Sequence, residues 1–73
     1  MKEGLLWYDN DPNTKLADKV KVAAKRYQTK LRRKPTVCYV NPNEADNNGL
    51  KVGAVQVKPA LHVLPHHFWV GVE

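Results

Sequence analysis

The sequence predicts a single two-layer α/β (α+β) domain, in which one long helix packs on a small mixed sheet of three to five strands. Its 73 residues allow one domain, residues 1–73, with a small core. One segment of about twenty residues has the apolar periodicity of a helix. Short apolar segments bounded by turn residues lie before and after it, which gives the order β-α-β-β-β.

The first strand and the helix are the best-marked elements. Residues 4–8 are apolar and aromatic and end in a polar turn, which is typical of a strand. Asp11 and Pro12 predict a helix start, because a carboxylate caps free amides and proline fits the first helical position. Apolar residues at spacings of three and four predict a helix over residues 13–33, ended by Pro35. The predicted buried stripe is Leu16, Val20, Ala23, Ala24, Tyr27 and Leu31.

The second half of the chain predicts further strands. Residues 36–40 are β-branched and aromatic, and a strand there completes a βαβ unit with two parallel strands and a right-handed crossover. Residues 42–49 predict a loop, and 52–58 alternate as a one-sided strand. Residues 60–64 fit either a short strand or an extended connection before the last strand at 68–72.

The apolar side chains outnumber what one helix can cover. The first, second and last strands carry bulky apolar residues on both faces, whereas a half-covered sheet normally alternates apolar and polar residues. We therefore expect a homodimer, formed through the uncovered sheet face or by pairing of edge strands. The residues predicted at this interface are Leu6, Trp7, Tyr8, Tyr39 and Trp69.

The predicted helix carries all of the net positive charge. Residues 13–34 hold nine Lys and Arg against Asp18 alone, a net charge of +8, while the rest of the chain sums to −3. A broad basic surface of this kind can bind a polyanion such as DNA or RNA through its phosphates; the alternative is a solvated helix face. No zinc-finger, KH or RRM motif accompanies it, so sequence-specific reading is not predicted. The predicted nucleic-acid-binding residues are Lys15, Lys19, Lys21, Lys25, Arg26, Lys30, Arg32, Arg33 and Lys34.

Acidic residues follow the first two strands. Asp9 and Asp11 leave the first strand and Glu44 leaves the second, and parallel strands end at the same sheet edge. Carboxylates gathered there could hold Mg²⁺ or Ca²⁺, but turns and helix caps use the same residues. His62, His66 and His67 also cluster in the sequence, although ordinary loop histidines explain them as well as a metal does. We expect no cofactor and no resident metal.

Other function classes have little support in the sequence. Serine is absent, Cys38 is the single thiol, and the four glycines are scattered, so neither nucleophilic catalysis nor a phosphate-binding glycine loop is predicted. No apolar run approaches the length of a transmembrane helix, and the start lacks a signal peptide's apolar core. A single cysteine fits a reducing compartment, so we expect a cytoplasmic protein with no membrane partner.

Three stretches resemble a group of short uncharacterised bacterial proteins. They are Gly4-Leu5-Leu6-Trp7-Tyr8-Asp9-Asn10-Asp11-Pro12, Ala23-Ala24-Lys25-Arg26-Tyr27 and Pro35-Thr36-Val37-Cys38. The resemblance covers most of the chain and implies one intact small protein, but it implies no activity, cofactor or catalytic residue. Similar proteins tend to have a glycine between the helix and the second strand, where this chain has Arg32-Arg33-Lys34.

The function predicted from these observations is a small basic binding module without enzymatic activity, which presents its Lys- and Arg-rich helix to DNA or RNA. Two alternatives stay open. One is an interaction module that binds a protein partner through the uncovered sheet face. The other is a small metal-dependent nuclease or hydrolase that uses Asp9 and Asp11.

Overall fold

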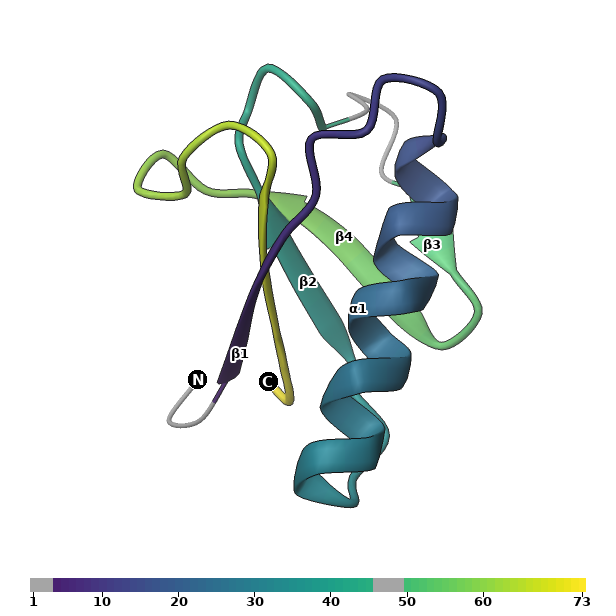
Figure 1. Cartoon of the computed structure of the whole chain (residues 1–73). Coiled ribbons are helices and arrows are strands. Elements are labelled where there is room, and N and C mark those ends of the chain that lie inside the picture. The colour runs from purple at the N-terminus through teal and green to yellow at the C-terminus, as the bar shows by residue number, and fades with distance from the viewer. Residues whose placement is uncertain (1–3, 46–49) are drawn as a thin grey trace.

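One helix packs across one face of a five-stranded mixed sheet in the computed structural model, which describes residues 4–45 and 50–73 (Figure 1). The spatial order is β1-β5-β2-β4-β3, in which β2 and β4 are parallel and all other neighbours are antiparallel. The predicted fold class and element order are confirmed. The elements are β1 (Gly4–Tyr8), α1 (Leu16–Leu31), β2 (Val37–Val40), β3 (Lys51–Val52), β4 (Val55–Pro59) and β5 (His67–Gly71).

The two strands that flank the helix run parallel, as predicted, but they are not neighbours. Both β1 and β2 pair antiparallel with β5, which lies between them. The last strand of the chain therefore enters the middle of the sheet and leaves β1 and β3 as its edges. Because β1 and β2 run in the same direction and β4 is parallel to β2, the carboxyl ends of these three strands lie at the same end of the sheet, which we call the carboxyl edge.

The hydrophobic core lies between α1 and the sheet. The predicted stripe is confirmed: Val20, Ala23 and Tyr27 are at most 1 % exposed. They face a layer of small and aromatic side chains from the central strands. Burial there raises the pKa of the Cys38 thiol to about 12, so this sulfur stays protonated and is a packing residue. The strand residues of the core are Cys38, Val40, Val52, Val55, Val57, Phe68 and Val70.

The helix begins later than the sequence predicts. Asp11 does not cap it; its carboxylate accepts hydrogen bonds from the Asn13 amide (2.9 Å) and the Thr14 hydroxyl (2.7 Å). These bonds close a local turn, an alternative to helix that Asp and Thr offer the backbone. The helix therefore starts at Leu16, and Lys15 occupies the capping position without a side-chain bond.

The prediction of one strand over residues 52–58 is wrong, because the chain reverses within that segment. Val52 pairs with Val55, and Gly53 and Ala54 form the two-residue turn between β3 and β4. Gly53 has a φ of +60°, a conformation open to glycine and typical of the first turn position in tight hairpins. The alternating Val residues of 52–58 are shared between two antiparallel strands, which explains why they resemble one.

Two further segments connect the elements. The predicted loop at 42–49 is a turn over residues 42–45, and residues 46–49 lie outside the described residues. Residues 60–66 form turns rather than a strand, which decides between the two predicted alternatives. Val63 anchors this segment: its side chain is 5 % exposed and its carbonyl accepts a hydrogen bond from the Asn41 amide group (2.9 Å).

Candidate functional site

The exposed arc of α1 and the chain that follows it form a basic face. Eight of the nine predicted nucleic-acid-binding residues are exposed there. Lys19 is the exception, because it is 7 % exposed and its ammonium donates to the Asp9 carbonyl (3.3 Å). Lys19 therefore ties the helix to the end of β1 and is not available to a polyanion. The basic face consists of Lys15, Lys21, Lys25, Arg26, Lys30, Arg32, Arg33 and Lys34.

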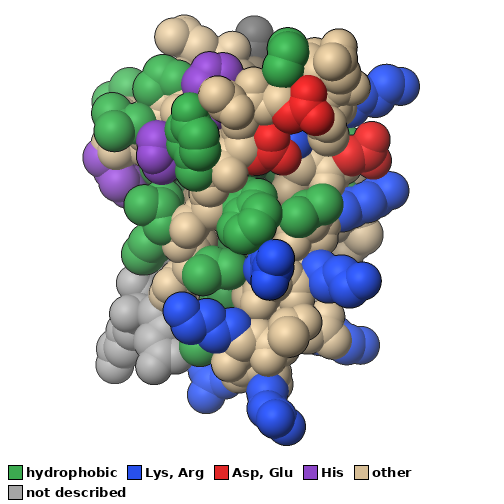
Figure 2. Space-filling view, in the orientation of Figure 1, with side chains coloured by type: hydrophobic (Ala, Val, Ile, Leu, Met, Phe, Trp, Pro, Cys, Tyr) green, Lys and Arg blue, Asp and Glu red, His purple; other side chains and the backbone are tan. Residues whose placement is uncertain are grey.

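Lys and Arg side chains gather over the helix in Figure 2, along the right and lower parts of the view. Hydrophobic and histidine side chains gather at the opposite, upper-left side. Within residues 4–45 and 50–73, no carboxylate lies within ion-pair distance of any residue of the basic face; the pairs found are Lys58–Glu73 and His66–Glu44. The charge of this face is thus left for solvent or a partner.

Arg26 occupies a particular place on the basic face. Its guanidinium carbon lies 5.4 Å from the centre of the Trp7 ring, a distance typical of a cation–π contact. Beside this pair, a groove of about 240 Å³ runs between α1 and the edge strand β1. The groove has an aromatic floor and two cations on its wall, an arrangement that the sequence did not reveal because Trp7 and Arg26 are distant in the chain. Its lining residues are Leu5, Trp7, Arg26, Thr29 and Lys30.

The other face of the sheet carries no helix, and we call it the open face. Leu6, Trp69 and Tyr39 lie in one row across β1, β5 and β2, because Leu6 and Tyr39 both pair with Trp69. Tyr8 lies two residues after Leu6 on β1, on the same face, and the centroid of its ring is 4.9 Å from that of the His67 ring. Four of the five predicted interface residues therefore share this face. Trp7 does not, because it alternates to the helix side and packs against the core.

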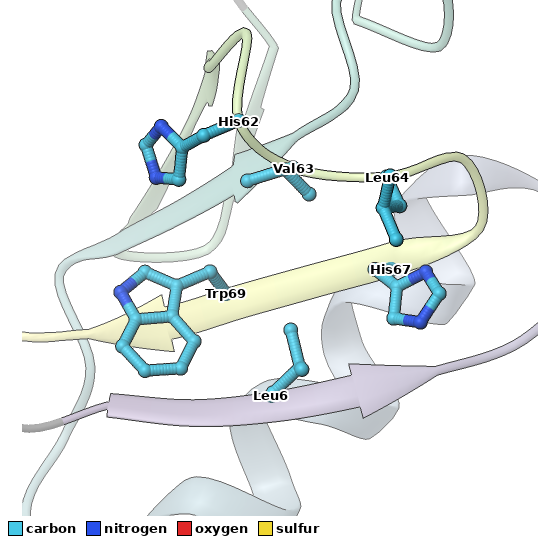
Figure 3. A pocket seen from close by; sticks show the side chains of 6 residues that line it. All are labelled: Leu6, His62, Val63, Leu64, His67 and Trp69. Atoms are coloured by element: carbon cyan, nitrogen blue, oxygen red, sulfur yellow. The ribbon is translucent and has the colours of Figure 1, made fainter.

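Segment 60–66 covers part of the open face and leaves a hollow beside it. The hollow has a volume of about 370 Å³, and Figure 3 shows its six lining side chains. Leu6 comes from β1, and Trp69 and His67 come from β5. The other three, from the segment, are His62, Val63 and Leu64, and the sequence did not predict that they lie beside this face. Pro59 before the segment and Pro65 within it were the available signal, since they separate the buried Val63 from the neighbouring strands.

The acidic residues at the carboxyl edge are used in local hydrogen bonds. The Asp9 carboxylate accepts from the Asp11 amide (2.9 Å), and that of Glu44 accepts from the His66 amide. Hydrogen bonds from the Thr14 hydroxyl and then the Asn13 amide lower the pKa of Asp11, which keeps this exposed carboxyl ionised. Within the described part of the chain, no three His, Cys, Asp or Glu side chains are placed to hold a metal ion. The geometry thus gives no basis for metal-assisted chemistry at Asp9, Asp11 and Glu44.

Within the described part of the chain, the three histidines do not form a metal-ligand cluster. His66 adopts a left-handed backbone (φ 65°) at the start of β5, and its ring lies 3.9 Å from the Glu44 carboxylate. The ring nitrogen Nδ1 of His67 contacts the Pro65 carbonyl at 2.8 Å. His62 lines the hollow from the connecting segment. They are loop and strand-end residues: His62 and His67 line the same hollow, and the rings of His66 and His67 both contact that of Tyr8.

Comparison with known proteins finds no matching family model, no similar curated protein and no similar solved structure. Among the described residues, no helix has both the length and the apolar character needed to cross a membrane. Two surfaces of the molecule, the basic face and the open face, therefore bear on its function.

Proposed function

We propose that this protein is a small cytoplasmic binding module without enzymatic activity, which holds DNA or RNA through the basic face. The observation that carries the proposal is that all eight cations of this face are exposed, with no ion pair to any of them within residues 4–45 and 50–73. A polyanion supplies the missing negative charge and gains entropy from the counterions that its phosphates release.

The spacing of the cations supports this proposal. Lys21 and Lys25, and likewise Arg26 and Lys30, lie four residues apart on α1, where like charges repel. Such pairs destabilise an isolated helix by a few tenths of a kcal/mol each, and one acid, Asp18, offsets them poorly. The helix tolerates the repulsion because its apolar stripe is packed against the sheet, and a bound phosphate backbone would remove it.

The groove beside Trp7 sharpens the proposal. Arg26 is already held over the Trp7 ring, so less side-chain freedom is lost when it contacts a phosphate. Lys30 lies on the same groove wall, so two cations flank an aromatic floor. Cations beside an aromatic ring are the usual means of holding single-stranded nucleic acid without reading its sequence. We therefore expect binding that depends on salt and little on base sequence.

The proposal is tested by replacing Lys25, Arg26 and Lys30 together with Gln. Binding of a labelled single strand and of a duplex is measured by fluorescence anisotropy over a salt series. The slope of log affinity against log salt should fall by about one unit for each lost contact, so by about three units. The matched control replaces Lys51 and Lys58, which lie on β3 and β4, and should leave the slope nearly unchanged.

Two results would contradict the proposal. One is the absence of any binding to either nucleic acid at low salt. The other is a slope that the Lys51 and Lys58 control lowers as much, per charge removed, as the helix variant does. That result would show a general effect of net charge, and the helix would then be a solvated surface.

A second function is favoured by the open face, which exposes apolar side chains around a hollow. Leu6 and Tyr8 are 56 % and 54 % exposed there, and Leu64 is 65 % exposed. Soluble monomers rarely leave a large connected apolar patch uncovered. An assembly role through this face does not compete with polyanion binding, because the two surfaces lie on opposite sides of the molecule.

A further inference from the structure

The open face combines exposed apolar side chains with a hollow. Leu6, Tyr8 and Leu64 lie on or beside it, and Leu61 of segment 60–66 is 93 % exposed. The hollow of about 370 Å³ lies between that segment and the row formed by Leu6 and Trp69. A surface with apolar side chains next to an apolar hollow can complement a copy of itself.

We propose that the occupant of the open face is a second copy of this chain, docked face to face about a two-fold axis. In such a pairing the same patch meets itself, so a side chain that projects from one copy meets the hollow of the other. Leu61 is the most exposed of the large hydrophobic residues that the structure describes, and in the sequence it directly precedes His62, which lines the hollow. Each copy thus supplies one leucine and receives one.

The distribution of charge favours a like partner on this face. The basic face lies on the far side of the sheet, so two copies can approach through their open faces without bringing their helices together. The described charged residues at this side include Lys58 and Glu73, and these two already pair with each other (3.2 Å). Docking through β1 edges would instead bring the Arg26 and Lys30 side chains of the two groove walls towards one another.

The size of the face is also sufficient. The described chain measures 29 × 23 × 21 Å and has 5107 Å² of accessible surface. A stable interface of standard size buries about 800 Å² on each partner, which is about a sixth of this surface. Each side of a body with these dimensions has about a sixth of its surface, so one side is large enough for such an interface without using the helix.

The geometry of the dimer also determines how it would hold nucleic acid, an inference that rests on the proposed function. Two copies joined through their open faces present their basic faces in opposite directions. The dimer would therefore hold two separate nucleic-acid segments and bridge them, rather than extend the contact along one segment. Each chain would thus bind a second copy through its open face and a phosphate backbone through its basic face.

Sedimentation equilibrium over a micromolar concentration series tests the dimer directly. The wild type should approach twice 8.3 kDa as concentration rises. The double variant Leu61→Glu, Leu64→Glu should raise the dissociation constant by at least about tenfold for each leucine. The matched control is Val22→Glu, which replaces an exposed apolar residue of α1 (45 %) and should leave association unchanged.

Two outcomes would overturn this inference. A wild type that stays at 8.3 kDa throughout the series shows that no dimer forms. A double variant that associates as strongly as the wild type shows that the copies meet elsewhere, as in edge-strand pairing. All three positions are exposed to solvent, so each variant should stay folded, and circular dichroism checks this.

A bridging assay separates this inference from the proposed function. A duplex fixed to beads should retain a second, labelled duplex when wild-type protein is added. The Leu61→Glu, Leu64→Glu variant should bind one duplex as a monomer but lose the bridging. If the wild type dimerises and binds no nucleic acid, the dimer stands and the polyanion proposal fails; if it binds as a monomer, the reverse holds.

Discussion

The two faces of the sheet differ in how far their side chains are buried. On the helix side, Tyr27 is 1 % exposed inside a layer of valines, and the charges stand on the outer surface of α1. On the open face, Tyr39 is only partly buried and shares a row with Leu6 and Trp69. One side therefore holds the fold together, and the other presents apolar groups that the chain itself covers only in part.

This difference follows from having one helix for a sheet whose strands β1, β2 and β5 carry apolar residues on both faces. The helix supplies a core, and its outer arc can then carry charge that adds nothing to packing. Segment 60–66, anchored by Val63 and one hydrogen bond from Asn41, covers part of the open face, and Glu73 bonds to Tyr39 and Lys58 on the same face. In a domain this small, the core on the helix side provides most of a limited stability, and the open face is left as a surface for binding.

One tyrosine from each face should give the largest difference in stability between the two sides of the sheet. Tyr27→Ala should lower the free energy of unfolding by about 3–5 kcal/mol, because it empties a large volume in the core. Tyr39→Ala should cost only about 1 kcal/mol, because its ring is partly exposed and space can fill with water. Urea unfolding followed by circular dichroism measures both losses.

Both substitutions are best made in the Leu61→Glu, Leu64→Glu background, so that association does not contribute to the stability measured. Equal losses at the two positions would mean that the open face is as well packed as the core, contrary to the structure. With a total stability of a few kcal/mol expected for this size, Tyr27→Ala should be largely unfolded at room temperature, and its loss is then at least the stability measured for the parent protein.

A smaller effect is expected where α1 ends. Arg32 has a left-handed backbone (φ 56°), and its amide donates to the Gln28 carbonyl (2.8 Å). This conformation costs an L residue about 1–2 kcal/mol and costs glycine almost nothing. Arg32→Gly should therefore raise stability by about 0.5–1 kcal/mol, measured as an increase in melting temperature.

The matched control is Arg33→Gly, which removes the same charge from the basic face at a residue without a positive φ. It should leave stability unchanged or slightly lower it, because glycine adds freedom to the unfolded chain. A similar gain for both variants would assign the effect to relief of charge repulsion instead of backbone strain.

Sequence periodicity was enough to predict the layers. The stripe that contains Val20 and Tyr27 identified the buried side of the helix, and the aromatic strands identified the sheet. What failed was local: the Asp11 turn delayed the helix by three residues, and Gly53 divided one apparent strand into two. In both places short-range hydrogen bonding or a positive φ competed with a pattern that fits either outcome.

The candidate site was predicted only in part, for a similar reason. Composition identified the basic helix, but burial of Lys19 depends on its reach to the Asp9 carbonyl across the packed layers. The hollow depends on where segment 60–66 crosses the sheet, and the insertion of β5 between β1 and β2 determines that. Such placements come from tertiary pairing, which no spacing within the sequence encodes.

On the open face, a hydrogen bond between two exposed side chains should contribute least to stability. The Tyr39 hydroxyl donates to the Glu73 carboxylate (2.7 Å), which also pairs with Lys58 (3.2 Å). The hydrogen bond from Tyr39, and then that from Lys58, lowers the pKa of Glu73 below its ordinary 4.5. A lowered folded-state pKa stabilises the fold above about pH 4.5, and this contribution is lost as pH falls through the lower value.

The same hydrogen bond raises the pKa of Tyr39 above its ordinary 10.0, so its contribution persists below that pH and is lost only as pH rises through the folded value. Tyr39→Phe should therefore be less stable than the wild type at neutral pH, by a small amount because Glu73 is exposed. The difference should shrink as urea unfolding is repeated at pH values progressively below 4.5. Tyr8→Phe on the same face, where no hydrogen bond to the hydroxyl is found among the described residues, should show no such trend. A Tyr39→Phe difference that stays constant into acid would mean that Glu73 is not held by Tyr39 in solution.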